Sequence, residues 1–281
     1  MDDGVVANAA DMDIMDGVED VRIRPLDSVD RLRDVERLQV EVWGMSDREV
    51  VPYHQLLAAV RNGGLVLGAF AAEELVGFCY GFPGVRDGEP VFCSHMTGVL
   101  PAWQTHDVGY RLKCAQREWA IAQGYSRMVW TYDPLQSLNA YFNLHKLGAE
   151  ARRYYVDYYG EMDDELNRGL PSDRIEVDWW LRAPEVVRRL AGRRVARQTA
   201  DAAPVLQAEG WRPGEVGEPG AAVVRIEIPR ALRALRDQDP DAALAWRLAT
   251  RQAFQRCFQR GYVAVDFVPS RQSGFYILQQ G

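Results

Sequence analysis

Residues 99–113 read VLPAWQTHDVGYRLK, and this stretch decides the fold. The residues before it, 91–99, form a largely apolar run that predicts a strand. After it, Leu112 and Ala115 share one face of a helix that begins near Val108. The N-terminus of a helix presents free backbone N–H groups, and its dipole favours negative charge there. The junction of strand, turn and helix therefore predicts a site for an anion such as a pyrophosphate.

The surrounding sequence predicts a series of strands and helices around this junction. Strands are expected over 21–26, 64–71, 75–82, 91–99, 127–131, 151–159 and 176–181, and helices over 28–43, 52–61, 108–123 and 138–147. Residues 84–90 are expected to form a longer turn. This order predicts an α/β fold of the mixed α+β kind, in which a central mixed sheet carries helices on both faces.

Composition narrows the class of protein. The 281 residues are 47% hydrophobic and 10% aromatic, enough for a substantial core, and the net charge of −7 argues against a general nucleic-acid-binding protein. The four cysteines form no Cys-x-x-Cys pair, so neither a metal site nor a disulfide framework is expected. No run of 18 apolar residues occurs, so we expect no membrane partner. These features predict a cytoplasmic location.

Changes in amino-acid composition along the sequence divide the chain into four parts. Residues 1–20 contain seven acids and no Lys or Arg, which predicts a disordered acidic tail. Residues 21–182 hold the predicted mixed sheet. Residues 183–220 predict a helix and a linker, because 198–220 is rich in Ala, Pro, Gly and Glu. Residues 221–281 predict a C-terminal α/β extension, too small to be stable alone, that packs on the main domain.

One motif in the opening stretch resembles a known family. The pattern Val99-x-Pro101-x-x-Gln104-x-x-Asp107-x-Gly109 resembles the phosphate-binding turn of the GNAT superfamily of acyl-CoA N-acyltransferases, usually written Q/R-x-x-G-x-G/A. Asp107 replaces the first glycine of that turn. An Asp tolerates left-handed backbone geometry less well than Gly. Its carboxylate is also unfavourable beside a phosphate unless the side chain turns away as a helix cap.

A second segment, residues 130–148, narrows the resemblance. Asp133-Pro134-Leu135, Asn139-Ala140, Phe142-Asn143 and Lys146-Leu147-Gly148 are similar to a little-characterised bacterial GNAT branch that includes amino-acid N-succinyltransferase-like members. The resemblance implies an N-acyltransferase. It would move an acetyl or succinyl group from acetyl-CoA or succinyl-CoA to the amine of a small molecule such as an amino acid. The amine would attack directly in a ternary complex.

The resemblance also implies where the acyl-CoA would bind. The pyrophosphate would lie on the N–H groups of residues 105–110, and the pantetheine arm would follow the edge of strand 91–99 where it separates from strand 127–131. The residues expected to bind CoA are Val99, Gln104, Thr105, His106, Asp107, Val108, Gly109, Tyr110, Asn139, Phe142 and Lys146. For Lys146, a solvated helix face is an equal alternative.

Catalytic roles are expected at four positions. The N–H of Val99, or of a neighbouring residue, would hold the developing oxyanion, and Asn139 would hydrogen-bond the pantetheine or the thiolate. His95 is the first candidate for the base because it lies on the central strand with the same parity as Val99. The alternative is that His95 only packs in the sheet. Asp133 and Glu161 are weaker candidates for the base.

The position of the family's usual acid departs from the pattern. A tyrosine normally lies four residues before the helix-ending glycine, and here that residue is Leu144. Asn143 is a neighbouring candidate for a catalytic role. This departure leaves two other readings open, namely a GNAT-fold protein that binds CoA with little or no catalysis, and a dimeric scaffold. A homodimer is an expected assembly in any of these cases.

Two further groups of residues have open roles. Tyr154, Tyr155, Tyr158 and Tyr159 either line an acceptor pocket or pack in the sheet. An arginine of the expected helix 240–259, such as Arg247 or Arg251, either joins the core or binds an acceptor carboxylate through two hydrogen bonds.

Overall fold

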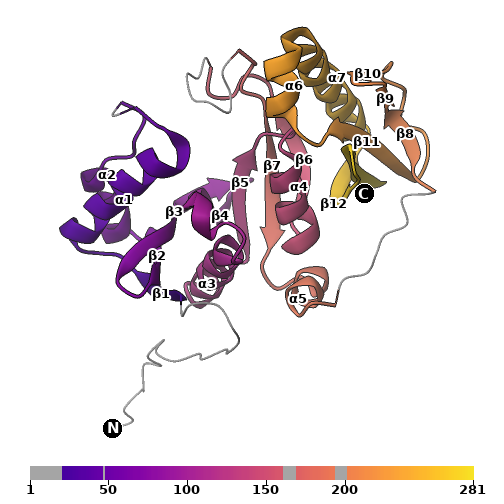
Figure 1. Ribbon diagram of the computed structural model, residues 1–281. Coiled ribbons are helices and arrows are strands. Elements are labelled where there is room, and N and C mark those ends of the chain that lie inside the picture. The colour runs from indigo at the N-terminus through magenta and orange to yellow at the C-terminus, as the bar shows by residue number, and fades with distance from the viewer. Residues whose placement is uncertain (1–20, 47, 161–168, 194–200) are drawn as a thin grey trace.

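The computed structural model describes residues 21–46, 48–160, 169–193 and 201–281. Within these ranges the backbone is built around one mixed sheet of eleven strands, in the order β1-β2-β3-β4-β5-β7-β6-β12-β13-β11-β8 (Figure 1). The strands are β1 (Val21–Pro25), β2 (Leu65–Ala71), β3 (Glu74–Arg86), β4 (Glu89–Val99), β5 (Arg127–Tyr132), β6 (Glu150–Tyr155), β7 (Arg174–Trp180), β8 (Ala203–Leu206), β11 (Val223–Pro229), β12 (Tyr262–Pro269) and β13 (Ser273–Gln280). A separate short pair joins β9 (Ala208–Glu209) and β10 (Arg212–Pro213). The predicted tail, 1–20, lies outside the described residues.

Helices cover both faces of the sheet. The helical segments are α1 (Val29–Trp43), α2 (Tyr53–Arg61), the 3-10 turn η1 (Pro101–Trp103), α3 (Val108–Ala122), α4 (Ser137–Ala140), the π-helix η2 (Tyr141–Lys146), α5 (Pro184–Leu190), α6 (Leu232–Gln238) and α7 (Pro240–Gln259). One apolar cluster packs α1 and α2 against one face of the sheet, and it includes Leu32, Leu56 and Phe78. A larger one lies on the opposite face and includes Leu112 and Trp179. The predicted α/β fold, with helices on both faces, is therefore confirmed.

The hairpin between β3 and β4 differs from the prediction. The expected longer turn over 84–90 is wrong, because the two strands pair as far as Arg86 and Glu89. Asp87 and Gly88 alone make the turn, with φ of 55° and 81°. Two successive residues with positive φ define a tight hairpin whose twist matches that of the strands, and Asp-Gly favours it.

Strands β4 and β5 separate after a short contact. They run parallel and pair only at Phe92 with Met128 and at Cys93 with Val129. Beyond these pairs β5 continues its ladder with β7 alone. We call the unpaired remainder, Ser94–Val99 of β4 facing Trp130–Tyr132 of β5, the β4–β5 opening. The helix α3 begins at the wide end of this opening, just after β4.

A β-bulge interrupts β4 at the narrow end of the opening. Gly81 of β3 pairs with Ser94, and Tyr80 pairs with Met96, so His95 is an extra residue without a partner in the ladder. A bulge places two successive residues against one and disturbs the alternation of side chains. The expected shared parity of His95 and Val99 is therefore wrong. His95 packs beside Tyr80 on the face of α1 and α2, whereas Val99 belongs to the core on the α3 face.

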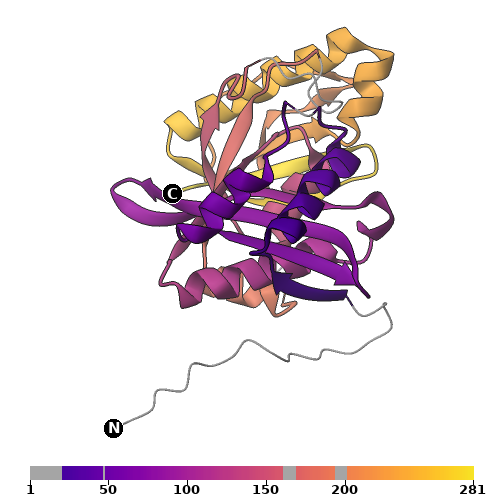
Figure 2. The same cartoon turned by 90° about the vertical axis from the view of Figure 1, so that its left-hand side faces the viewer.

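The C-terminal strands extend the same sheet. They join it through β12 and β6, which share one residue pair, Ala264 with Ala151. Figures 1 and 2 show this C-terminal unit, coloured orange to yellow, at the end of the sheet away from α1 and α2. The predicted linker is wrong in part, because its residues 203–206 form β8, which pairs in parallel with β11. None of the helices in the described ranges is long and apolar enough to cross a membrane.

Candidate functional site

The turn after β4 has the geometry of an anion site. Gln104 donates its side-chain amide to the carbonyl of Val99 at 3.1 Å, which fixes the turn against the end of the strand. Asp107 follows in left-handed geometry, with φ of 52°, and α3 begins at Val108. The first N–H groups of a helix lack intrahelical partners, so those of Val108, Gly109 and Tyr110 are directed out of the helix end. A phosphate placed there meets backbone donors and the positive end of the helix dipole.

The Asp107 side chain does not cap the helix. It makes no capping hydrogen bond, and its Oδ1 lies 2.9 Å from Nζ of Lys146, the last residue of η2. The Lys146 ammonium therefore offsets the one negative charge at the helix N-terminus. The ion pair also joins the two segments of sequence on which the predicted CoA site depends.

The backbone of Val99 faces the β4–β5 opening. Leu100 donates its N–H to the carbonyl of Val76 at 2.9 Å, so Leu100 forms a hydrogen-bonded pair with β3. Residues of an antiparallel pair alternate between bonded and unbonded positions. The N–H of Val99, at the unbonded position opposite Gly77, is consequently directed away from β3 and toward the side where β5 has separated. A carbonyl oxygen bound there would accept a hydrogen bond from this N–H.

The segment after β5 presents some predicted residues and buries others. Asn139 is exposed and Phe142 is half-buried on the short helices α4 and η2. Asn143 is buried, and its Oδ1 accepts a hydrogen bond from the indole N–H of Trp130 at 3.2 Å. Leu144 is fully buried in the core. The Asn143 oxygen thus has a structural partner on β5.

Two predicted residues lie on the outer side of the turn. Thr105 and His106 are exposed, and the Thr105 hydroxyl lies 3.3 Å from Nδ1 of His106. The His106 ring packs on Trp103 of η1, with ring centroids 5.3 Å apart. Tyr110 is half-buried, and its hydroxyl donates to the carbonyl of Leu190 at 3.3 Å, which ties α3 to α5.

His95 packs against two residues, Tyr80 and Phe82, that line a pocket on the α2 side of the sheet. Its ring centroid lies 5.9 Å from that of Tyr80 and 5.7 Å from that of Phe82. Although much of its surface is exposed, these neighbours partly desolvate the imidazole, and the burial lowers the pKa of His95 below its usual value. The neutral, proton-accepting form is therefore favoured at neutral pH.

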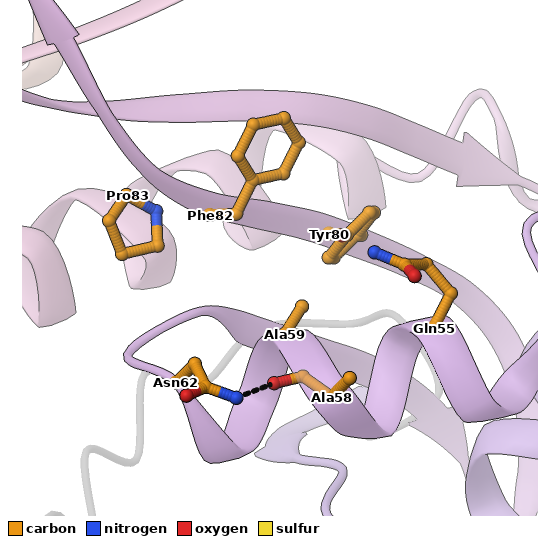
Figure 3. A pocket seen from close by; sticks show the side chains of 7 residues that line it. All are labelled: Gln55, Ala58, Ala59, Asn62, Tyr80, Phe82 and Pro83. Carbon is orange, nitrogen blue, oxygen red and sulfur yellow. Dashed lines mark hydrogen bonds between the residues drawn. The ribbon is translucent and has the colours of Figure 1, made fainter.

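The pocket itself lies between α2 and β3 and measures about 350 Å³. Its lining, drawn in Figure 3, comprises Gln55, Ala58, Ala59, Asn62, Tyr80, Phe82 and Pro83. Asn62 is already engaged, because its side-chain amide donates to the carbonyl of Ala58 at 2.7 Å. The pocket therefore has apolar and aromatic walls with a few polar groups.

The weaker candidates for the base are placed differently. Asp133 is buried, and both of its oxygens accept hydrogen bonds from Arg247 at 2.7 Å. One of them also accepts the N–H of Leu135 at 2.9 Å, which shapes the loop after β5. Both oxygens of this carboxylate are thus engaged within the protein, in the contact between the loop and α7. Glu161 lies outside the described residues.

The same contacts decide the open roles of the arginines of α7. Arg247 binds Asp133, and Arg251 binds Asp173 with distances of 2.8 and 2.9 Å. Both act in the core contact between α7 and the sheet, and each already has a carboxylate partner. Of the tyrosines, Tyr154 donates to Asp173 at 2.7 Å, while Tyr158 and Tyr159 are exposed.

One buried residue at this site was missed in the sequence. Lys113 of α3 is only 2% exposed, and its Nζ donates to the hydroxyl of Ser94 at 2.8 Å. The ammonium also lies 3.5 Å from the ring centroid of Trp130. Burial lowers the pKa of Lys113 from 10.5 to about 7. In the sequence, a lysine on an amphipathic helix is expected to point into solvent. The one signal of its burial was that it lies close to the buried positions 108, 112 and 116 of the same helix.

Comparisons with known proteins give likenesses of fold only. No protein-family model and no curated protein matches the sequence. Among solved structures, this chain is similar to one described as an acetyltransferase of the GNAT family from Desulfovibrio desulfuricans, with 14% identity over 58% of this chain and 99% of that one, at a TM-score of 0.48. It is also similar to the ribosomal-protein-S18-alanine N-acetyltransferase from Escherichia coli, with 13% identity over 56% and 92% of the two chains and a TM-score of 0.45. A third is the IAA acetyltransferase from Bacillus cereus, with 17% identity over 57% and 98% and a TM-score of 0.42. These likenesses are weak, so a function has to be argued from the geometry of the site.

Proposed function

We propose that this chain is an acyl-CoA-dependent N-acyltransferase that moves an acetyl or succinyl group to the amine of a small molecule such as an amino acid. The observation that carries the proposal is the separation of β4 and β5 after two residue pairs, with the N-terminus of α3 at the wide end. This arrangement supports the binding of an acyl-CoA for two reasons. It offers an anion site for the pyrophosphate and a strand edge for the amide-containing pantetheine.

The proposed reaction uses the groups at the opening. The pyrophosphate binds N–H groups of the turn that Gln104 holds, those of Val108, Gly109 and Tyr110 among them, with Lys146 beside it. The N–H of His106 already donates to the carbonyl of Trp103 at 3.2 Å. Asn139 and Phe142 contact the arm. The N–H of Val99, or that of a neighbouring residue of β4 nearer the narrow end, stabilises the oxyanion as the amine attacks the thioester carbon. The amine enters from the pocket on the α2 side, where neutral His95 accepts its proton directly or through a water molecule. The C–S bond then breaks and CoA leaves as its thiol.

The experiment is a free-thiol assay with the full chain, acetyl-CoA or succinyl-CoA, and a panel of amines that includes amino acids. Amine-dependent release of CoA, with an amide product seen by mass spectrometry, supports the proposal. The absence of turnover with both donors across the panel, together with measured CoA binding, would overturn it in favour of the second candidate.

That second candidate is a protein that binds CoA without catalysis. Leu144, buried and apolar where the related pattern has an acid, favours it. Calorimetry separates it from a protein that does not use CoA, because both candidates require CoA binding. In both candidates, the acyltransferase-like domain is proposed to span 21–182 and the extension 221–281. The proposed assembly is a homodimer.

A further inference from the structure

Lys113 lies at the point where β4 and β5 separate. Its Nζ is held by Ser94 and by the ring of Trp130, at 2.8 and 3.5 Å. Ser94 is the first residue of β4 beyond the last pair with β5, and Trp130 is the first residue of β5 beyond it. The amine thus lies directly behind the narrow end of the β4–β5 opening, on the side of α3.

The surroundings of this amine contain no acid to balance its charge. In the described ranges, the titratable groups that act on Lys113 are the thiols of Cys79, Cys93 and Cys114, from β3, β4 and α3. The Ser94 hydroxyl in turn donates to the side-chain oxygen of Gln116 at 2.7 Å. The side-chain nitrogen of Gln116 has no partner within the same ranges. An ammonium buried without a carboxylate is costly, so burial favours the neutral amine, and an anion brought to the site would favour the charged form.

We propose that Lys113 supplies the positive charge and the proton for the departing CoA thiolate. This inference rests on the function proposed above. As the amine nitrogen bonds to the thioester carbon, the C–S bond breaks and its electron pair goes to sulfur. A proton moves from Nζ to that sulfur, which gives free CoA thiol and neutral Lys113. The amine regains its proton from solvent once the products leave.

The chemistry of the site fits this role. Leu144 leaves the position of the usual acid apolar, and the Lys113 ammonium contacts the ring of Trp130, the first residue of β5 in the opening. The pKa of about 7 keeps a substantial fraction of Lys113 protonated at neutral pH. It also lies close enough to the pKa of a thiol, about 8.5, for the proton to move easily in either direction.

The test is the acidity of the CoA thiol bound to the intact protein. Alkylation of bound CoA by iodoacetamide, followed between about pH 6 and 9, reports the thiolate without needing turnover. The wild type is expected to hold about tenfold more thiolate at neutral pH than Lys113→Met. The same substitution is expected to lower kcat about 10- to 100-fold. Since Met is similar in volume and removes a buried charge, the variant is expected to fold.

A matched control keeps the result specific. Thr250→Val also replaces a buried polar group of a helix by an apolar one, on α7 and outside the contacts of Lys113, and it is expected to leave both the thiol acidity and kcat unchanged. The inference is overturned if CoA binds and its alkylation profile is the same in wild type and Lys113→Met. If CoA does not bind the wild type at all, the proposed function itself fails, which is a different result.

Discussion

Nζ of Lys146 lies 2.9 Å from Oδ1 of Asp107, across the wide end of the β4–β5 opening. Lys146 comes from the π-helix after β5, and Asp107 from the turn after β4. The pair therefore joins the two strands that separate at this place. It also explains how a carboxylate can stand at a helix N-terminus that is proposed to bind phosphate, since the neighbouring ammonium offsets its charge.

Substitutions of this pair should change CoA binding more than stability. Lys146→Met leaves Asp107 uncompensated and is expected to weaken CoA binding about tenfold, or about 1.4 kcal/mol. Asp107→Gly removes the carboxylate, suits the φ of 52°, and is expected to strengthen binding. Exposed ion pairs contribute about 0–1 kcal/mol, so the free energy of unfolding should change little. Calorimetric titration with CoA measures the affinities, and equal values for all three proteins would contradict this account.

His95 should give the rate its dependence on acid pH. Its pKa is lowered by burial, so the neutral base form is lost only as the pH falls below its usual value near 6.5. The kcat/KM of the wild type should therefore be level near neutral pH and fall in acid. His95→Ala is expected to lower kcat/KM about 100-fold and to remove this limb. His54→Ala changes an exposed histidine on α2 and serves as the control. An unaltered profile in His95→Ala would reject the role.

The local elements were predictable because they depend on short-range patterns. Helix α7, for example, has the predicted bounds 240–259, and Asp239 caps it by accepting the N–H of Ala242. The bulge at His95 was not predictable. It depends on how β4 pairs with β3, and a one-residue change of register reverses which face a side chain joins.

The long-range contacts of the site could not be predicted from the sequence for the same reason. Asp133 and Arg247 are 114 residues apart, and nothing near either residue shows that they pair. Lys113 has an ordinary helical context, and only its position behind the β4–β5 opening gives it an unusual pKa. Residues 203–206, expected to belong to an Ala- and Pro-rich linker, form strand β8 because they pair with the backbone of β11.

The Asp133–Arg247 pair should dominate the stability of the contact between α7 and the sheet. Both side chains are buried, and Arg247→Met leaves the Asp133 carboxylate without its partner. The expected loss is about 3–5 kcal/mol in the free energy of unfolding, measured by urea denaturation. The exposed pair of Arg24 and Glu73 is the control, and Arg24→Ala should cost at most about 1 kcal/mol. A loss for Arg247→Met as small as that of the control would contradict the prediction.

Lys113 should make stability depend on alkaline pH. Its pKa is about 7 in the folded protein and near 10.5 when unfolded, so between these values the unfolded chain binds more protons. The free energy of unfolding should then rise with pH in this window, by about 1.4 kcal/mol per unit. Buried cysteines and tyrosines with raised pKa values act in the opposite direction at higher pH. Subtracting the curve of Lys113→Met isolates the lysine, and a flat difference between pH 7 and 10 would show that its pKa is ordinary.

The most direct test of the central claim is amide hydrogen exchange of the full chain with and without saturating CoA. If CoA binds in the β4–β5 opening, exchange should slow about tenfold or more at Val99 and at residues 105–110. The amides of β11 and β13, at the far end of the sheet, should keep their rates. Unchanged exchange at Val99 and 105–110 under saturating CoA would contradict the account.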